Sequence, residues 1–160
     1  MIDLKTLNVG ESIQYTGSLI VMRDAAQKRL LEIQNTGKEL PVSLAEKLVF
    51  YAGPTFSKGK MIIGPTTSKR MDRFLEFLAQ NGVLATIGKG ARTMQAIEVI
   101  KKYQMPYFVA PSGCAAYLSQ KVLSWKIIAF EDLGPEAIYE IEVKDFPLIV
   151  MIDSQGKGVF

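Results

Sequence analysis

The sequence contains no histidine and only one cysteine, Cys114. Histidine is the commonest general base and the commonest metal ligand in proteins, so demanding chemistry here must use other groups or come from a partner chain. One cysteine excludes an internal disulfide framework, and it cannot by itself hold a zinc ion or an iron–sulfur cluster. We therefore expect this chain to bind no metal. We interpret Cys114 as a small packed residue, because no histidine is present to activate it as a nucleophile.

Long apolar runs and concentrated charge are also missing. The longest apolar stretches, such as residues 148–152, are far too short to span a bilayer, and the start, MIDLKTLNVG, has no basic segment followed by an apolar one. A net charge of +3 is too mild to argue for nucleic acid, which requires a concentrated basic face, and it suits a small acidic ligand better. We expect a cytoplasmic protein that binds neither membrane nor nucleic acid.

Enough apolar sequence is present to build a core. The 160 residues are 48% hydrophobic and 22% charged, which predicts one compact domain over residues 1–160. Strand and helix patterns alternate between residues 48 and 130, which predicts an α/β fold with a substantially parallel sheet and helices packed on it. Flanking paired strands predict an added antiparallel layer, so the sheet is expected to be mixed. The expected strands are residues 12–15, 19–22, 48–52, 83–87, 107–110, 125–130, 141–143 and 148–152, with a turn at 16–18.

Helices are expected after several of these strands. The first is capped by Asp24 and ends at Gly37, and the second is capped by Thr66 or Thr67 and ends at Gly82. A third helix contains residues 96–103, and a fourth opens at residues 112–113. Residues 55–60 are expected to form a polar loop.

The stretch Gly64–Asp72, GPTTSKRMD, is the most unusual in the chain. Its helix carries Lys69 and Arg70 in the first turn, where a capping box would place Glu or Gln. The macrodipole already makes this end of a helix positive, so each cation costs a few tenths to about 1 kcal/mol unless an anion offsets it. Arg70 presents a rigid fork that matches a carboxylate, and we interpret it as a ligand. We interpret Lys69 as a solvated surface residue.

Two further junctions between a strand and a helix carry cations. Lys89 stands between Gly88 and Gly90, which would let a ligand approach the backbone closely, and Arg92 follows at the start of the next helix. The full Walker spacing of a phosphate loop is absent, which argues against an ATPase. Arg23 lies at the third junction, where a surface arginine and a ligand are both open interpretations. Ligands collect at the carboxyl ends of the strands in such sheets. The residues predicted along this rim are Arg23, Thr66, Arg70 and Lys89.

Three carboxylates, Glu131, Asp132 and Glu136, gather in one turn late in the chain. They could be mistaken for the acid and base of a catalytic pair. We expect them instead to stabilise helix starts and to pair with nearby basic residues.

Four segments together carry a family resemblance. In chain order they are RDAA at 23–26, GPTTSKRMD at 64–72, IGKG at 87–90 and EDLGPEAIYEIEVKDFPLIV at 131–150. They resemble the beta subunit of the iron–sulfur-dependent class I fumarases and tartrate dehydratases, which forms the carboxyl-terminal domain of single-chain members. The resemblance covers nearly the whole chain. It implies a swivelling β/β/α domain that pairs with a larger alpha subunit, which holds a 4Fe–4S cluster on three cysteines. It also suggests two copies of each subunit.

The resemblance implies roles for individual residues. Arg70 and Lys89 would hold the substrate carboxylate remote from the cluster. Thr66 would move the C3 proton, and Arg23 would lower the pKa of its hydroxyl. The remaining residues expected to bind substrate are Thr67, Gly88 and Gly90. The implied reaction is the reversible hydration of fumarate to malate, which needs the alpha subunit. The alternatives are the beta subunit of an L(+)-tartrate dehydratase and a stand-alone module that binds small anions without catalysis.

The sequence departs from the family pattern at three places. Gln27 stands where the family usually has histidine, which leaves open any role of that ring. Ser112 and Gly113 replace a pair of glycines. Lys69 stands where many members have a small residue, and it is a candidate for tuning substrate choice.

Overall fold

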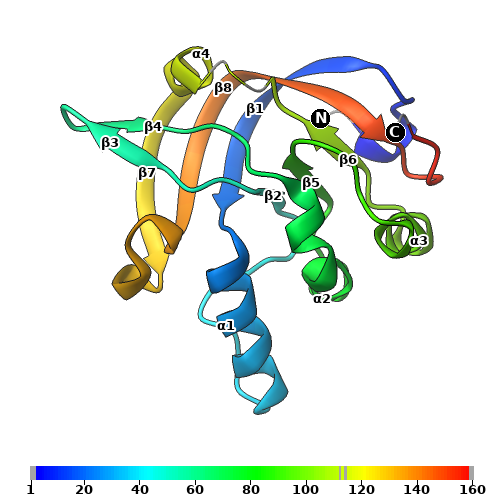
Figure 1. Cartoon of the computed structure of the whole chain (residues 1–160), viewed down its shortest axis with the longest axis horizontal. Coiled ribbons are helices and arrows are strands. Elements are labelled where there is room, and N and C mark those ends of the chain that lie inside the picture. Colours follow the sequence, from blue (N-terminus) through cyan, green and yellow to red (C-terminus); the bar gives the residue numbers. More distant parts are fainter. Residues whose placement is uncertain (1–2, 112, 114, 159–160) are drawn as a thin grey trace.

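A closed ring of strands forms the centre of the computed structural model, which describes residues 3–111, 113 and 115–158. Strand β8 pairs with both β6 and β1, and this double pairing closes the ring. Strand β7 (Val122–Ala129) lies outside the ring, against β8 (Figure 1). The strands of the ring, in order, are β1 (Ser12–Val21), β2 (Leu48–Phe50), β5 (Ala85–Gly88), β6 (Tyr107–Val109) and β8 (Ile138–Ile152).

Four of the ring strands are parallel neighbours, which confirms the predicted mixed α/β sheet. Strand β1 pairs in parallel with β2, β2 with β5, and β5 with β6. The prediction that the strand near residues 125–130 belongs to the parallel part is wrong, because β7 runs antiparallel to β8. The short connection between them, η3 (Glu131–Glu136), explains this, since a parallel pairing needs a crossover of about a dozen residues or more.

Two pairs of expected strands are in fact single long strands. Residues 12–15 and 19–22 are predicted to form a hairpin. All of them except Met22 lie in the continuous β1, with a register shift between Tyr15 and Gly17. Residues 141–143 and 148–152 both belong to the 15-residue β8. The polar residues between the expected short strands do not end the pairing. Because β1 and β8 pair with each other along most of their length, the ladder continues past a bulge.

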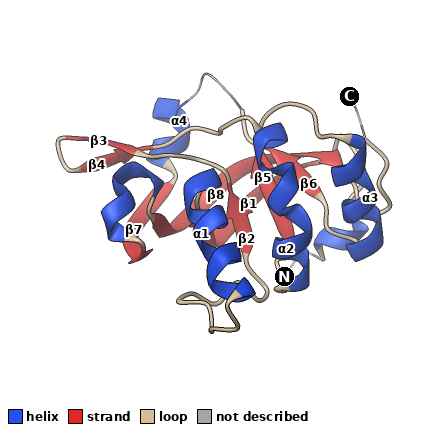
Figure 2. Ribbon diagram, turned by 60° about the horizontal axis from the view of Figure 1, so that its bottom comes forward, coloured by secondary structure: helices blue, strands red, loops and turns tan. Residues whose placement is uncertain are grey.

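Alternating side chains of the ring strands build two cores. Leu19, Phe50 and Phe146 point into the ring, where the two aromatic rings meet edge to face at 5.5 Å. Their neighbours on the other face, such as Ile20, pack against Leu30 and other helical side chains. Figure 2 shows α1 (Asp24–Asn35) and α2 (Leu75–Gln80) in front of the strands. The helices that pack on this outer core are α1 (Asp24–Asn35), α2 (Leu75–Gln80) and α3 (Met94–Tyr103).

Several local predictions need correction. The expected polar loop at residues 55–60 contains a hairpin of β3 (Thr55–Ser57) and β4 (Lys60–Ile62). Its turn has positive φ at Lys58 and Gly59, which suits a tight hairpin. Asp24 is the first residue of α1, and the cap position is held by Arg23 without a side-chain bond.

The remaining short elements lie around the ring. They are η1 (Leu4–Thr6), η2 (Ser68–Phe74), which leads directly into α2, and α4 (Ala115–Gln120). Within the residues described, no helix is both long and apolar enough to cross a membrane.

Candidate functional site

The loops that follow β1, β2 and β5 meet at one edge of the ring. These strands are parallel neighbours, so their carboxyl ends lie together. Arg23 follows β1, Gly53 follows β2, and Lys89 follows β5. The backbone of Arg23 and of Lys89 therefore lies at the carboxyl ends of these strands, and the grouping of their side chains stays a prediction.

The segment 64–68 lies across the ends of β2 and β5 and joins Thr66 to this edge. The Thr66 N–H donates to the Tyr51 carbonyl (2.7 Å), and the Lys89 N–H donates to the Thr66 carbonyl (3.3 Å). Ser68 N–H in turn donates to the Lys89 carbonyl (3.0 Å). Bridges pair Ala52 with Pro65 and Thr67 with Lys89. The backbone of the predicted anion cradle is thus fixed by its neighbours on both sides.

The helix that follows this segment begins as a 3₁₀ helix and not as the predicted α-helix. Residues 68–74 form a 3₁₀ helix, η2, with Lys69 and Arg70 exposed in its first turn and no acidic residue there. Thr67 holds the cap position, but it makes no side-chain capping bond, so the expected hydroxyl cap is wrong. The bond from Ser68 N–H to the Lys89 carbonyl already satisfies one of the amides that a cap would bind.

Arg70 lies close to the start of α1. Its Nη2 is 3.6 Å from Asp24 Oδ1, and its side chain remains 52% exposed. Asp24 directly follows Arg23 in the chain, so this contact brings Arg70 to the junction of β1 and α1. This distance exceeds that of a hydrogen bond, so the Arg70 fork is held loosely.

Arg23 lies flat against the backbone of Gly53. A Cβ built on Gly53 would lie 2.5 Å from Cζ and 2.7 Å from Nε of Arg23, so a larger residue here would displace the arginine head from this position. Nε of Arg23 is 3.7 Å from Glu136 Oε1. The expectation that the late acidic turn pairs with basic residues is confirmed here, and also where Asp132 accepts two bonds of 2.9 Å from Arg29.

A buried amide supports the Arg23 backbone from within the core. Gln27 Nε2 donates to the Arg23 carbonyl (3.2 Å) and lies 3.4 Å from Met71 Sδ. Its Oε1 has no hydrogen-bond partner among the described residues. Of the other two departures from the family pattern, Lys69 is exposed in η2, and Ser112, like Cys114, lies outside the described residues.

Arg92 belongs to the core of the protein rather than to the rim. Its Nε donates to Asp72 Oδ1 (2.6 Å), and its other nitrogens donate to Thr86 and Tyr51. Burial alone would lower the pKa of Arg92, but Tyr51 and Asp72 raise it overall, so the guanidinium stays charged. Asp72 also accepts from the Thr93 N–H (2.7 Å), which ties η2 to the start of α3.

The glycines beside Lys89 differ in their surroundings. A Cβ on Gly88 would collide with Ser68 Oγ, so this buried glycine permits the segment 64–68 to lie on β5. Gly90 is exposed, and its carbonyl accepts a bond of 2.7 Å from the Tyr107 hydroxyl. That hydroxyl accepts in turn from Ser68 Oγ (2.8 Å). Burial raises the pKa of Tyr107 to about 12, which keeps it protonated as a donor.

Sequence reasoning missed Gly53, Asp24 and Glu136 as neighbours of the arginines. Gly53 looked like an ordinary end of a strand, and Asp24 like a helix cap. The sequence offered one indication of these contacts, the acidic turn at residues 131–136. It is expected to pair with basic residues, but the sequence does not indicate which ones.

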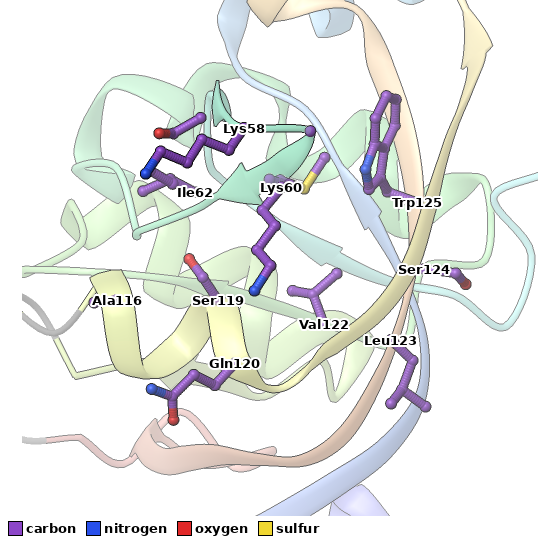
Figure 3. Close-up of a pocket in the computed structure, with 13 residues that line it drawn as sticks. Lys58, Lys60, Ile62, Ala116, Ser119, Gln120, Val122, Leu123, Ser124 and Trp125 are labelled. Carbon is purple, nitrogen blue, oxygen red and sulfur yellow. The ribbon is translucent and has the colours of Figure 1, made fainter.

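Two cavities of the described structure lie away from this rim. One, of about 660 Å³, is bounded by the β3–β4 hairpin, α4 and β7, with Lys60 directed into it and Trp125 on its far wall (Figure 3). The other, of about 670 Å³, lies near η1 and the starts of β2 and β5. Neither is lined by the predicted site residues. Within the described part of the chain, no group of three or more Cys, Asp or Glu side chains could hold a metal ion.

Comparison with known proteins agrees with the motifs at this rim. The L(+)-tartrate dehydratase subunit beta of Escherichia coli (strain K12) is 36% identical over 165 residues, covering 98% of this chain and 81% of the relative. A Methanocaldococcus jannaschii protein, provisionally named L(+)-tartrate dehydratase subunit beta, is 36% identical over 167 residues. The match covers 99% of this chain and 86% of the relative. "Fumarate hydratase class I, anaerobic" of Escherichia coli (strain K12) is 34% identical over 165 residues, covering 99% of this chain but 30% of that enzyme.

The family described as Fumarase C-terminus matches residues 2–160, nearly the full length of the chain. Together with these relatives, this match shows that the chain belongs to the Fumarase C-terminus family.

Proposed function

We propose that this chain is the beta subunit of a class I hydro-lyase that reversibly hydrates fumarate to malate. The observation that supports the proposal is that the backbone of Arg23, Thr66 and Lys89 lies at one edge of the ring. Arg70 is 3.6 Å from Asp24, the residue after Arg23. The relatives are named as a beta subunit and as a longer fumarate hydratase, which supports a second, alpha subunit as the partner. We further propose that the domain swivels against that subunit, that the complex holds two copies of each chain, and that it works in the cytoplasm.

The substrate would be held by its carboxylate. Arg70 offers two parallel donors in one plane, and Lys89 adds a second charge from the neighbouring strand end. Thr67 and Gly90 are exposed at the same edge, where they can contact the ligand, while Gly88 contributes by letting the segment lie close. Bound this way, the dicarboxylate presents its C3 carbon to Thr66.

Proton transfer at C3 is assigned to the Thr66 hydroxyl. A threonine hydroxyl is a poor base, and a nearby cation is needed to lower its pKa. Arg23 would supply this charge, because it lies over Gly53, and the neighbouring Ala52 bridges Pro65, the residue before Thr66. An iron–sulfur cluster on the alpha subunit would supply Lewis-acid chemistry at the substrate hydroxyl.

A second candidate is the beta subunit of L(+)-tartrate dehydratase. It is favoured by the names of two relatives at 36% identity, against 34% for the fumarate hydratase. Fumarate and tartrate chemistry use dicarboxylates of the same length, so the same cations would serve either one.

An anaerobic assay of the reconstituted complex tests the proposal. The partner is the chain of the same organism that matches the part of class I fumarate hydratase outside this domain. We expect fumarate hydration, and a loss of about 10²- to 10⁴-fold in kcat for Thr66→Val, the range for a removed general base. Lys28→Met, an exposed change on α1, is the control. Turnover of a tartrate enantiomer alone would favour the second candidate. Binding of dicarboxylates without any turnover would favour a module that only binds anions.

A further inference from the structure

Glu136 faces Arg23 from the turn between β7 and β8. We propose that Glu136 is a positioning residue: its carboxylate holds the Arg23 guanidinium over the Gly53 backbone and so fixes where the positive charge stands relative to Thr66. This inference rests on the proposed function, because it concerns the arginine assigned to activate Thr66.

The contact between the two side chains is buried but incomplete. Nε of Arg23 and Oε1 of Glu136 are each shielded from solvent, and neither has a hydrogen-bond partner among the described residues. They lie 3.7 Å apart, slightly too far for a hydrogen bond. Leaving a buried donor or acceptor unpaired costs free energy. A contact between this donor and this acceptor therefore stabilises both, because neither has another partner among the described residues.

Gly53 closes the other side of the arginine. Its missing Cβ leaves the space that Cζ, Nε and Nη2 of Arg23 occupy. The guanidinium of Arg23 therefore lies between the Gly53 backbone on one side and the Glu136 carboxylate on the other. Gly53 follows Ala52, which bridges Pro65, the residue before Thr66. Through this bridge, the Gly53 backbone beneath the arginine is connected to the segment 64–68 that carries Thr66.

The turn that carries Glu136 is fixed to the helix that begins after Arg23. Asp132, in the same turn, accepts both bonds from Arg29 on α1, and the Tyr139 hydroxyl donates to the Gly134 carbonyl (3.1 Å). Arg23 and Glu136 are thus attached to two elements, α1 and η3, that the Arg29–Asp132 pair ties together, while the Tyr139 bond holds η3 to β8. A rigid frame of this kind is what a positioning contact requires.

Position matters here because the effect on Thr66 is electrostatic. The pKa of a hydroxyl responds to a cation within about 4–6 Å and weakly beyond that range. An arginine that is free to turn toward solvent would spend part of its time outside this range. Loss of Glu136 is therefore expected to reduce the rate of the proton transfer more than the binding of substrate.

The first experiment measures the contact without any enzymatic assay. In the ¹⁵N-labelled full chain, the Nε–H of Arg23 is expected to exchange slowly with solvent, and Glu136→Ala is expected to speed this exchange at least tenfold. Glu131→Ala, an exposed carboxylate in the same turn, is the matched control and should leave the rate unchanged. Equal exchange in the wild type and in Glu136→Ala would overturn the proposal.

The second experiment measures the consequence in the reconstituted complex. Glu136→Ala is expected to lower kcat at least tenfold while KM changes less than threefold, and Glu136→Gln, which keeps an oxygen acceptor, should recover most of kcat. A merely structural ion pair predicts a lower melting temperature with kcat retained, and that result would overturn the positioning role. If the wild-type complex turns over no dicarboxylate, the proposed function fails, while the exchange experiment still decides whether Glu136 holds Arg23.

Discussion

Nη2 of Arg70 lies 3.6 Å from Oδ1 of Asp24, the residue directly after Arg23. The carboxylate proposed to bind Arg70 in the complex would therefore compete with one that the protein already supplies. Because the pair is half exposed, the competition is expected to be mild.

Asp24→Asn should strengthen substrate binding. An exposed ion pair contributes about 0–1 kcal/mol, so freeing Arg70 should lower KM by up to about fivefold. The same change weakens the favourable charge at the start of α1, so the free energy of unfolding should fall by a few tenths to about 1 kcal/mol. Steady-state kinetics and denaturant titration measure the two effects. A higher KM would show that Asp24 orients Arg70 rather than competing for it.

Arg70→Lys should keep the charge and lose the fork. A charged hydrogen bond contributes about 1.5–3 kcal/mol, and the loss of the second one is expected to appear in kcat/KM at that size. Lys69→Arg, one residue earlier and exposed, provides a control for charge and fork at a different position. Unchanged kinetics in Arg70→Lys would remove Arg70 from the proposed site.

Gly88→Ala should displace the segment that carries Thr66. The new Cβ would collide with Ser68 Oγ and lie 3.0 Å from the Tyr51 ring, an overpacking that costs about 1–3 kcal/mol of stability. Adding Ser68→Ala removes the colliding oxygen. We expect the double variant to be more stable than the sum of the single changes predicts, as measured by urea unfolding. Strict additivity would show that the collision is relieved elsewhere.

Asp72→Ala should be the most destabilising of these changes. It leaves the buried Arg92 guanidinium without its carboxylate, and breaking a buried pair in this way costs about 3–5 kcal/mol. Glu76→Ala, which removes the exposed partner of Lys102, is the matched control and should unfold much like the wild type. Equal stability of the two variants would contradict the assigned burial of Arg92.

The raised pKa of Tyr107 predicts that the free energy of unfolding falls at high pH. Its pKa is raised to about 12, while an unfolded tyrosine ionises near 10, so ionisation favours the unfolded chain. The associated stability, about 2–3 kcal/mol, is complete below about pH 10 and disappears as pH rises from about 10 to 12. In Tyr107→Phe the decline should be shallower, although Tyr15 and Tyr139, whose pKa values are also raised, leave some slope. Unfolding in guanidinium at several pH values measures both slopes.

The local pattern of the sequence was sufficient to predict the parallel strands and the edge at which Arg23 and Lys89 follow them. Each of these facts follows from one strand and the turn after it. The pairings of Arg23 with Glu136 and of Arg92 with Asp72 could not be predicted, because each joins segments whose approach depends on the closed ring. For the same reason, the sequence did not predict that β1 and β8 are each one continuous strand. A polar bulge and a true turn look alike until the partner strand is known.

Strand β8 has a consequence for the order in which the chain can fold. It places Ile149 opposite Ser12 and also supplies partners to β6 and β7. During synthesis, β1 therefore emerges from the ribosome long before the segment that covers its edge. Such distant contacts slow folding, and an uncovered edge invites pairing with other chains. A nascent chain of this family should thus depend on chaperones until residues 138–152 have been released.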